Sequence, residues 1–216
     1  MPILDRTLTI SRFWTIAKTE TARLEGEKIC GKFTEGPRPL RIKDPKAVCE
    51  EFANLPQTPD QILRFTRNYA PLHIPASTGQ RFEFAVSKWI KYQTDFRADW
   101  AKLTPATGIS PRMRAQGRPL LAKLGRDSEL WIYPEGIVLR VQAFLTLIYL
   151  FLAAFPTERL RVCPVPACPH PYFVAHHLRQ TFCGNEACIA WGMRRDRLAY
   201  WHKNKDRLRP KGKGAK

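Results

Sequence analysis

Four of the six cysteines fall within one short stretch, in two pairs of identical spacing. Four residues separate Cys163 from Cys168, and four separate Cys183 from Cys188. A tetrahedral zinc site needs four ligands, and two closely spaced thiol pairs supply them from two short turns. The spacing therefore predicts one structural Zn²⁺ ion held by all four thiolates. Because a filled ligand shell leaves no open position for water, it does not indicate catalysis.

Two other interpretations of the cysteines are two disulfides or four unrelated buried thiols. Disulfide frameworks belong to secreted chains. The N-terminal sequence MPILDRTLTISRFW lacks the basic start, the apolar run and the cleavage site that a signal peptide has. We therefore expect a cytoplasmic protein with reduced cysteines. His170, His176 and His177 lie inside the same stretch and could replace one thiolate. The separate Cys30 and Cys49 are typical of small buried hydrophobic residues.

Residues 159 to 201 resemble the CGNR-type zinc finger that ends many bacterial proteins, often behind an ABATE-type domain. The shared features are the first cysteine pair, the aromatic Phe173, then Arg179 and Phe182 ahead of the second pair, and the basic segment that follows. In the family, Gly-Asn-Arg follows the fourth cysteine, whereas Ile-Ala-Trp follows Cys188 here. The resemblance implies a zinc-binding, DNA-binding module.

The net charge is strongly positive and is concentrated near the C-terminus. The chain has 36 Lys and Arg against 19 Asp and Glu, giving +17, and 13 of the basic but only 3 of the acidic residues lie within 159–216. Such a charge favours polyanionic partners. The segment after Cys188 is compatible with a helix, whose apolar stripe through Trp191, Leu198, Trp201 and Leu208 we expect to pack on the finger.

The predicted nucleic-acid contacts are the basic residues of the finger and its helix. They are Arg179, Arg194, Arg195, Arg197, Lys203, Lys205, Arg207 and Arg209. Arg179 has two possible roles, because it could screen the four thiolates or contact a phosphate. We expect a treble-clef-like arrangement: a first knuckle, a hairpin through residues 172–182, a second knuckle, and a helix whose first turn supplies Cys188.

The rest of the chain predicts an α+β, mostly helical protein with small N-terminal strands. Asp44 and Thr58 are expected to cap two helices, the second through a capping box with Gln61. Apolar residues at helical spacing over residues 81–103, including Trp89 and Trp100, predict a central core helix. Strands are expected at 6–16, 28–33, 39–42 and 129–133, an exposed linker at 104–119, and a buried helix at 137–155.

Three domains or segments follow from these patterns. Residues 1–157 are expected to form a mainly helical domain, 158–209 the four-cysteine finger with its basic helix, and 210–216 a disordered basic tail. Arg140 and Gln142 interrupt the apolar run 137–155, which leaves it too short to cross a membrane.

The function predicted from the sequence is a zinc-binding, DNA-binding protein, a bacterial transcription regulator without enzymatic activity. One alternative is a zinc-stabilised protein-interaction module. A more distant one is a treble-clef nuclease, suggested only by His176 and His177 between the cysteine pairs.

Overall fold

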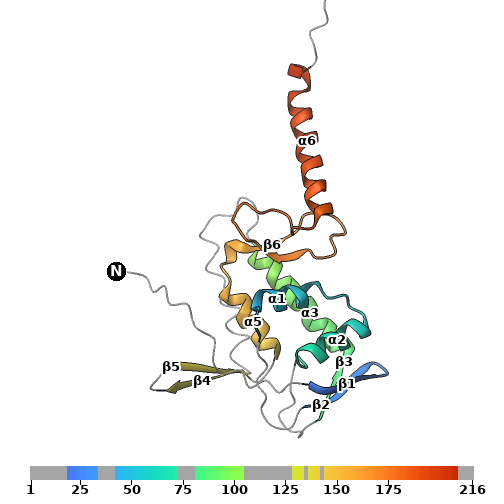
Figure 1. The fold of residues 1–216 in the computed structure, drawn as a ribbon, viewed down its shortest axis with the longest axis vertical. Helices are drawn as coiled ribbons and strands as arrows, with labels where there is room; N and C mark the ends of the chain where they lie inside the picture. The colour runs from blue at the N-terminus through green and yellow to red at the C-terminus, as the bar shows by residue number, and fades with distance from the viewer. Residues whose placement is uncertain are drawn as a thin grey trace, which may run out of the picture.

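The computed structural model of this chain describes residues 19–33, 42–72, 81–104, 128–133, 136–141 and 144–208. This part of the chain contains five α-helices and seven short strands, and every strand pair is antiparallel. Four of the helices form one body, from which the last helix projects alone (Figure 1). The protein is therefore helix-rich and α+β, as the sequence predicts.

A three-stranded sheet covers one end of the body. It comprises β1 (Thr19–Glu25), β2 (Lys28–Phe33) and β3 (Arg81–Ala85), in the order β1-β2-β3. Ile29 pairs with Phe84, and the buried side chains of Ile29, Phe82 and Phe84 alternate with exposed positions. The predicted strand at 28–33 is confirmed. Those at 6–16 and 39–42 lie outside the described residues, apart from Ile42.

Helices α1 (Pro45–Asn54) and α2 (Pro59–Asn68) begin where the sequence predicts. The Oδ1 atom of Asp44 accepts a hydrogen bond from the amide of Ala47 at 3.0 Å, which caps α1. Thr58 stands at the corresponding position of α2, but its side chain makes no capping hydrogen bond. The predicted capping box is therefore wrong, and the extended Thr58 followed by proline marks the start of this helix.

Two predicted helices begin later than expected. Helix α3 (Val86–Leu103) follows strand β3, whereas the sequence predicted one helix from residue 81. Helix α5 (Phe144–Ala154) follows a hairpin of β4 (Ser128–Tyr133) and β5 (Gly136–Val141), whereas the sequence predicted a helix from 137. The end of α5 before Pro156 is as predicted. The predicted linker at 104–119 lies outside the described residues, apart from Thr104.

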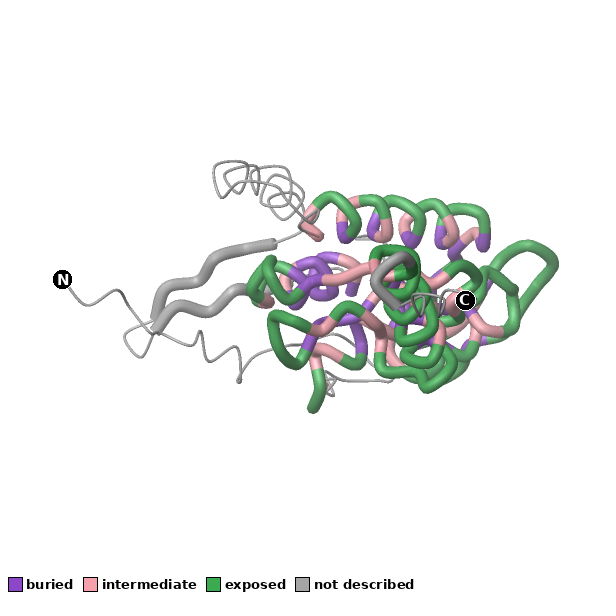
Figure 2. Tube along the Cα trace, turned by 90° about the horizontal axis from the view of Figure 1, so that it is seen from above, coloured by how far each residue is buried: buried purple, intermediate pink, exposed green. Residues whose placement is uncertain are grey.

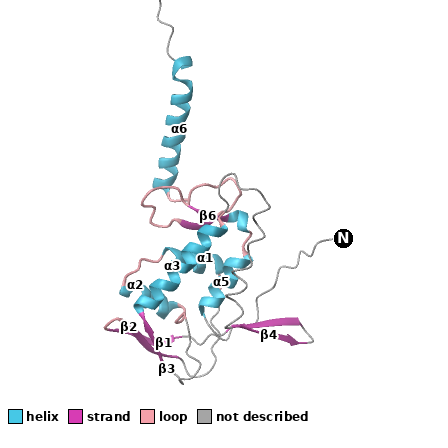
Figure 3. Ribbon diagram, turned by 180° about the vertical axis from the view of Figure 1, so that it is seen from behind, coloured by secondary structure: helices cyan, strands magenta, loops and turns pink. Residues whose placement is uncertain are grey.

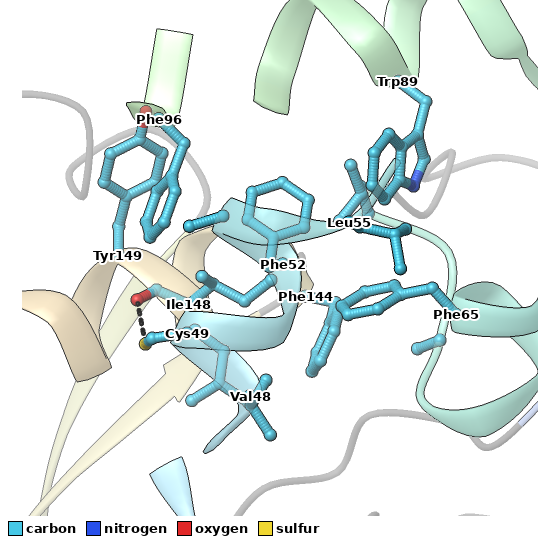
Figure 4. Packing of buried hydrophobic residues seen from close by; sticks show 14 of the residues in the cluster. Val48, Cys49, Phe52, Leu55, Phe65, Trp89, Phe96, Phe144, Ile148 and Tyr149 are labelled. Carbon is cyan, nitrogen blue, oxygen red and sulfur yellow. Dashed lines mark hydrogen bonds between the residues drawn. The ribbon is translucent and has the colours of Figure 1, made fainter. Parts of the chain in front are cut away.

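Aromatic side chains from different helices form the centre of the core. The ring of Phe52 in α1 lies 5.6 Å from Phe65 of α2 and 5.1 Å from both Trp89 and Phe96 of α3 (Figure 4). The amide of Gln93 is fully buried and donates to the carbonyls at the end of α1. The predicted aromatic core of α3 is thus confirmed, and Figure 2 shows the buried positions along the inward sides of the helices.

The C-terminal part begins with a short hairpin and ends in the projecting helix. A single turn, η2 (Thr157–Arg159), leads into β6 (Leu160–Val162), which pairs with β7 (Tyr172–Val174). Helix α6 (Glu186–Leu208) extends away from the body over 23 residues, about 35 Å at 1.5 Å per residue (Figures 1 and 3). Among the described helices, none is both long enough and apolar enough to cross a membrane.

The hairpin differs from the one predicted at 172–182. The partner of β7 precedes the first cysteine, so the first cysteine pair lies in the loop between β6 and β7. Residues 175–185 contain a turn and bends but no strand. The pairing is explained by burial, because Leu160 and Val174 face each other across the hairpin and both belong to the main core.

Candidate metal centre

The four cysteines of the two pairs come together in space. Their Sγ atoms all lie within 4.8 Å of one another, and that of Cys168 is 3.6 Å from those of Cys183 and Cys188. Ligands about 2.3 Å from a zinc ion at tetrahedral corners would be separated by about 3.8 Å. A disulfide bond measures about 2.05 Å, and all six cysteines are free thiols. The donor set and its spacing therefore fit a tetrahedral metal site, and no disulfide is present.

Turn hydrogen bonds position the first pair. Cys163 follows β6 directly, and its amide donates to the carbonyl of Pro171 at 2.7 Å across the hairpin. The amide of Cys168 donates to the carbonyl of Val165 at 3.2 Å, after the positive φ of Ala167. These bonds turn the chain so that both thiols face the second pair.

A helix N-terminus positions the second pair. Gly184 has a φ of 92°, and the Oδ1 atom of the following Asn185 accepts a hydrogen bond from the amide of Ala187 at 2.9 Å. Asn185 thus caps α6 and places Cys188 in its first turn, where the helix dipole favours a thiolate. The sequence predicted this position of Cys188 but not the cap.

A small apolar cluster covers the thiols. Phe173, Ala175 and two of the cysteines are buried in it, and Phe182 packs against them. Gly192 of α6 lies against the ring of Phe182, and the guanidinium of Arg195 lies 5.9 Å from the Phe182 ring and 5.4 Å from the Trp191 ring. Helix α6 is therefore attached to the rest of the finger by its first three turns, as far as Arg195.

Burial and mutual proximity control the protonation of the thiols. Burial raises the pKa of Cys168 and of Cys188. Burial also acts to raise the pKa of Cys163, but the backbone amides of Val165 and Cys183 and the neighbouring thiols outweigh it and bring this pKa below its usual value. A bound dication would convert all four thiols to thiolates and release protons.

The histidines lie outside the thiol cluster. In the described part of the chain, the four cysteines are the only group of three or more His, Cys, Asp or Glu residues that could hold a metal. His170 is exposed, and the Nε2 atom of His176 is 3.2 Å from the Nζ atom of Lys46 in α1. His176, His177 and Arg179 line an open hollow of about 450 Å³ beside the finger.

Polar side chains of α1 join the finger to the body. The side-chain amide of Asn54 donates to the carbonyl of Tyr172 at 2.7 Å, and its Oδ1 atom accepts from the Tyr172 amide at 3.0 Å. One turn earlier, the Oε1 atom of Glu50 accepts from the Val174 amide at 2.7 Å. These two residues therefore supply hydrogen-bond partners for the backbone groups along the open edge of β7. Neither residue is predicted from the sequence, in which their spacing of four residues in α1 is the only signal.

The predicted contact residues of α6 are exposed where the structure describes them. Arg194, Arg195, Arg197, Lys203 and Lys205 all face solvent, as does Arg179 in the finger. Arg207 belongs to α6, but its side chain, like all of Arg209, lies outside the described residues.

The predicted apolar stripe of α6 does not pack as expected. Trp191 is half-buried beneath the guanidinium of Arg195, whereas Leu198 and Trp201 are exposed. The reason is geometric, because α6 leaves the finger after its first turns and meets no described element beyond them (Figure 3). The predicted contact is therefore wrong for Leu198 and Trp201, and the side chain of Leu208 lies outside the described residues.

Comparison of the chain with protein-family models, with curated proteins and with solved structures finds no match.

Proposed function

We propose that the four cysteine thiolates hold one structural zinc ion that fixes α6 to the finger. The supporting observation is the separation of 3.6 Å between neighbouring sulfur atoms, close to the edge of a zinc–thiolate tetrahedron. The ion would neutralise thiolates that burial disfavours, and it would connect the β6–β7 loop to the first turn of α6. Four protein ligands fill the shell, so we propose a non-catalytic role.

We further infer that this finger binds nucleic acid, specifically DNA, as part of a transcription regulator. The observation that supports it best is a helix that extends into solvent with five exposed cations and one carboxylate between residues 194 and 205. Cations on a projecting helix can approach phosphates without obstruction from the body. The resemblance to CGNR-type fingers favours the same function.

The experiment compares DNA affinity and its salt dependence between two charge variants of the full-length protein. Replacing Arg194, Arg195 and Arg197 with alanine should weaken binding to all DNA sequences in a random pool. It should also lower the slope of log affinity against log salt by up to about three, at about 0.9 per phosphate contact.

The matched control removes the same charge from the body, by replacing the exposed Lys32, Arg64 and Lys91 with alanine. It should change the slope little. If both triple variants behave alike while zinc stays bound, α6 is not the contact.

A second candidate function is a zinc-stabilised protein-interaction module. The exposed Met193 and Leu198 on α6 favour it, because apolar side chains in solvent are typical of protein interfaces. Binding of a protein partner that persists at high salt, with no measurable affinity for DNA, would favour this second function.

A further inference from the structure

The projecting part of α6, residues 193–205, leaves four large apolar side chains in solvent. We call this segment the α6 arm. Met193 is 64% exposed, Leu198 53%, Tyr200 63% and Trp201 53%. Helices in proteins gain most of their stability from packing of an apolar face. Apart from the guanidinium of Arg195 over the Phe182 ring, this segment extends away from the rest of the described chain (Figure 1). The α6 arm therefore has the composition of a surface that a partner covers.

The charge of the α6 arm restricts the type of partner. It carries Arg194, Arg195, Arg197, Lys203 and Lys205, and its only carboxylate, Asp196, lies 3.2 Å from the guanidinium of Arg195. A second copy of the arm would bring cations against cations with almost no compensating carboxylates. An anionic partner is complementary to it.

The distribution of the apolar side chains does not match a membrane surface. A helix that lies on a membrane has its apolar residues on one side and its cations on the other. In the α6 arm, Met193 and Tyr200 are seven residues apart and share one side, whereas Leu198 lies nearly opposite Tyr200. Cations lie between these apolar positions around the helix, so no single apolar side exists.

We propose that the α6 arm binds unpaired nucleotides, with the rings of Tyr200 and Trp201 stacking on bases while adjacent cations neutralise phosphates. This inference rests on the proposed nucleic-acid binding and specifies its substrate as single-stranded. In a duplex the base faces stack on one another and only the base edges are open in the grooves, so exposed rings find no base face to stack on. A single strand alternates phosphates with open base faces, the combination that cations interleaved with aromatic rings can bind.

The ring of Trp201 is also partly positioned before binding. It lies in an edge-to-face arrangement with His202 at a centroid distance of 5.1 Å. This contact restricts the indole without covering it, because Trp201 stays more than half exposed. A restricted, accessible ring loses less conformational entropy on stacking than a freely rotating one.

The test uses the full-length, zinc-loaded protein at one fixed salt concentration. Its probes are a thymidine homopolymer and a duplex of the same length. Replacing Trp201 or Tyr200 with alanine should weaken binding to the single strand about 5- to 150-fold, the range for loss of one stacked base. Binding to the duplex should stay unchanged, and Trp201→Phe should retain most of the single-strand affinity. Because alanine is the best helix former, these changes preserve the helix.

Leu198→Ala is the matched control, since Leu198 is as exposed as Trp201 but has no ring to stack. It should leave both affinities unchanged. An equal loss on the single strand and the duplex, or no loss on either, would overturn the stacking proposal. So would concentration-dependent self-association that Trp201→Ala abolishes without altering single-strand binding, because the arm would then be an interface between two copies.

The variant lacking Arg194, Arg195 and Arg197 separates this inference from the proposed function. If it weakens binding to both probes while Trp201→Ala weakens neither, nucleic-acid binding stands and stacking is wrong. If it weakens neither, the proposed function itself is wrong.

Discussion

At the scale of single residues, the contact between Gly192 and Phe182 joins the basic helix to the metal centre. A glycine inside a helix costs about 1 kcal/mol relative to alanine. A Cβ atom at position 192 would overlap the ring of Phe182, which directly precedes Cys183. The absence of a side chain at residue 192 therefore allows α6 to lie against the finger.

We expect Gly192→Ala to destabilise the zinc-loaded finger although it improves helix propensity. Overpacking a tight contact costs about 1–3 kcal/mol, whereas the gain in helix propensity is about 1 kcal/mol. Because a Cβ atom would overlap the ring directly, we expect a cost in the upper part of that range, which outweighs the gain. The measurement is the free energy of unfolding of the metal-bound protein. Adding Phe182→Leu to the variant should restore part of the loss, and a Gly192→Ala variant more stable than the parent would contradict the role given to this contact.

The metal site gives a second prediction at this scale. The protein should purify with one zinc ion per chain, and serine at residue 163, 168, 183 or 188 should abolish stoichiometric zinc in elemental analysis, because a hydroxyl is a poor zinc ligand. Cys30→Ser is the matched control, since Cys30 lies in β2 outside the thiol cluster, and it should keep the ion. Zinc retained by Cys183→Ser but lost from His176→Ala would show a different ligand set.

The sequence could predict the four cysteines as a set but not their surroundings. Pairs separated by four residues can hardly lie far apart, so the spacing alone brings each pair together. The Asn185 cap is a local bond to the Ala187 amide, a start signal that the sequence carries and that our prediction omits. Gly192, in contrast, acts through a contact with Phe182 that depends on the path of the finished chain. The exposure of Trp201 also depends on that path, because apolar spacing along a helix does not show whether another element lies beside it.

At the scale of elements, the errors in the predicted helices have a common cause. Phe82 and Val86 are four residues apart, which fits a helix, but Phe82 and Phe84 are two apart, which fits a strand. Pairing of Phe84 with Ile29 in β2 determines the outcome, and that partner is more than fifty residues away in the sequence. The run after residue 136 is similar, since its first part pairs with β4 before α5 begins at Phe144.

The contact between α1 and β7 gives a pH-dependent prediction. Burial is the main cause that raises the pKa of Glu50, while the Val174 amide and Lys46 act in the opposite direction. The folded protein therefore binds this proton more readily than the unfolded chain. Stability from this group is greatest below the usual carboxyl pKa and falls as the pH rises through the raised value.

Glu50→Gln keeps an oxygen acceptor for Val174 and removes the buried charge. We expect it to match the parent in acid and to exceed it in the free energy of unfolding above the raised pKa. Glu50→Ala should lose on the order of 1–3 kcal/mol at every pH, because the Val174 amide loses its partner. Metal loss in acid affects all variants alike, so differences between variants are the quantity to compare. A stability difference between the Gln variant and the parent that does not change with pH would contradict this assignment.

At the scale of the whole molecule, the β6–β7 hairpin of the finger packs on the hydrophobic core of the body, whereas the rest of the finger does not. Leu160 and Val174 of the hairpin belong to the main core, and Asn54 bonds both backbone groups of Tyr172. The loop with the first cysteine pair and helix α6 depend instead on the metal centre and the small cluster around Phe182. The sequence predicts a domain boundary between residues 157 and 158. The contacts of Leu160, Val174 and Tyr172 with the body join the two sides of that boundary.

We therefore expect zinc removal to unfold part of the finger while the body stays folded. With a strong chelator, amide hydrogen exchange should rise in residues 163–171 and 183–208, because an isolated helix is only marginally stable in water. Exchange in α1, α3 and α5 should change little, and β7 should keep protection through Asn54 and Glu50. Asn54→Ala should then extend the loss of protection into β7 on chelation, whereas Asn204→Ala, at an arm position far from the hairpin, should not. Loss of protection in the body together with α6 would contradict this prediction. The metal centre and the helical core would then unfold as a single cooperative unit, because the core would also depend on the free energy of zinc binding.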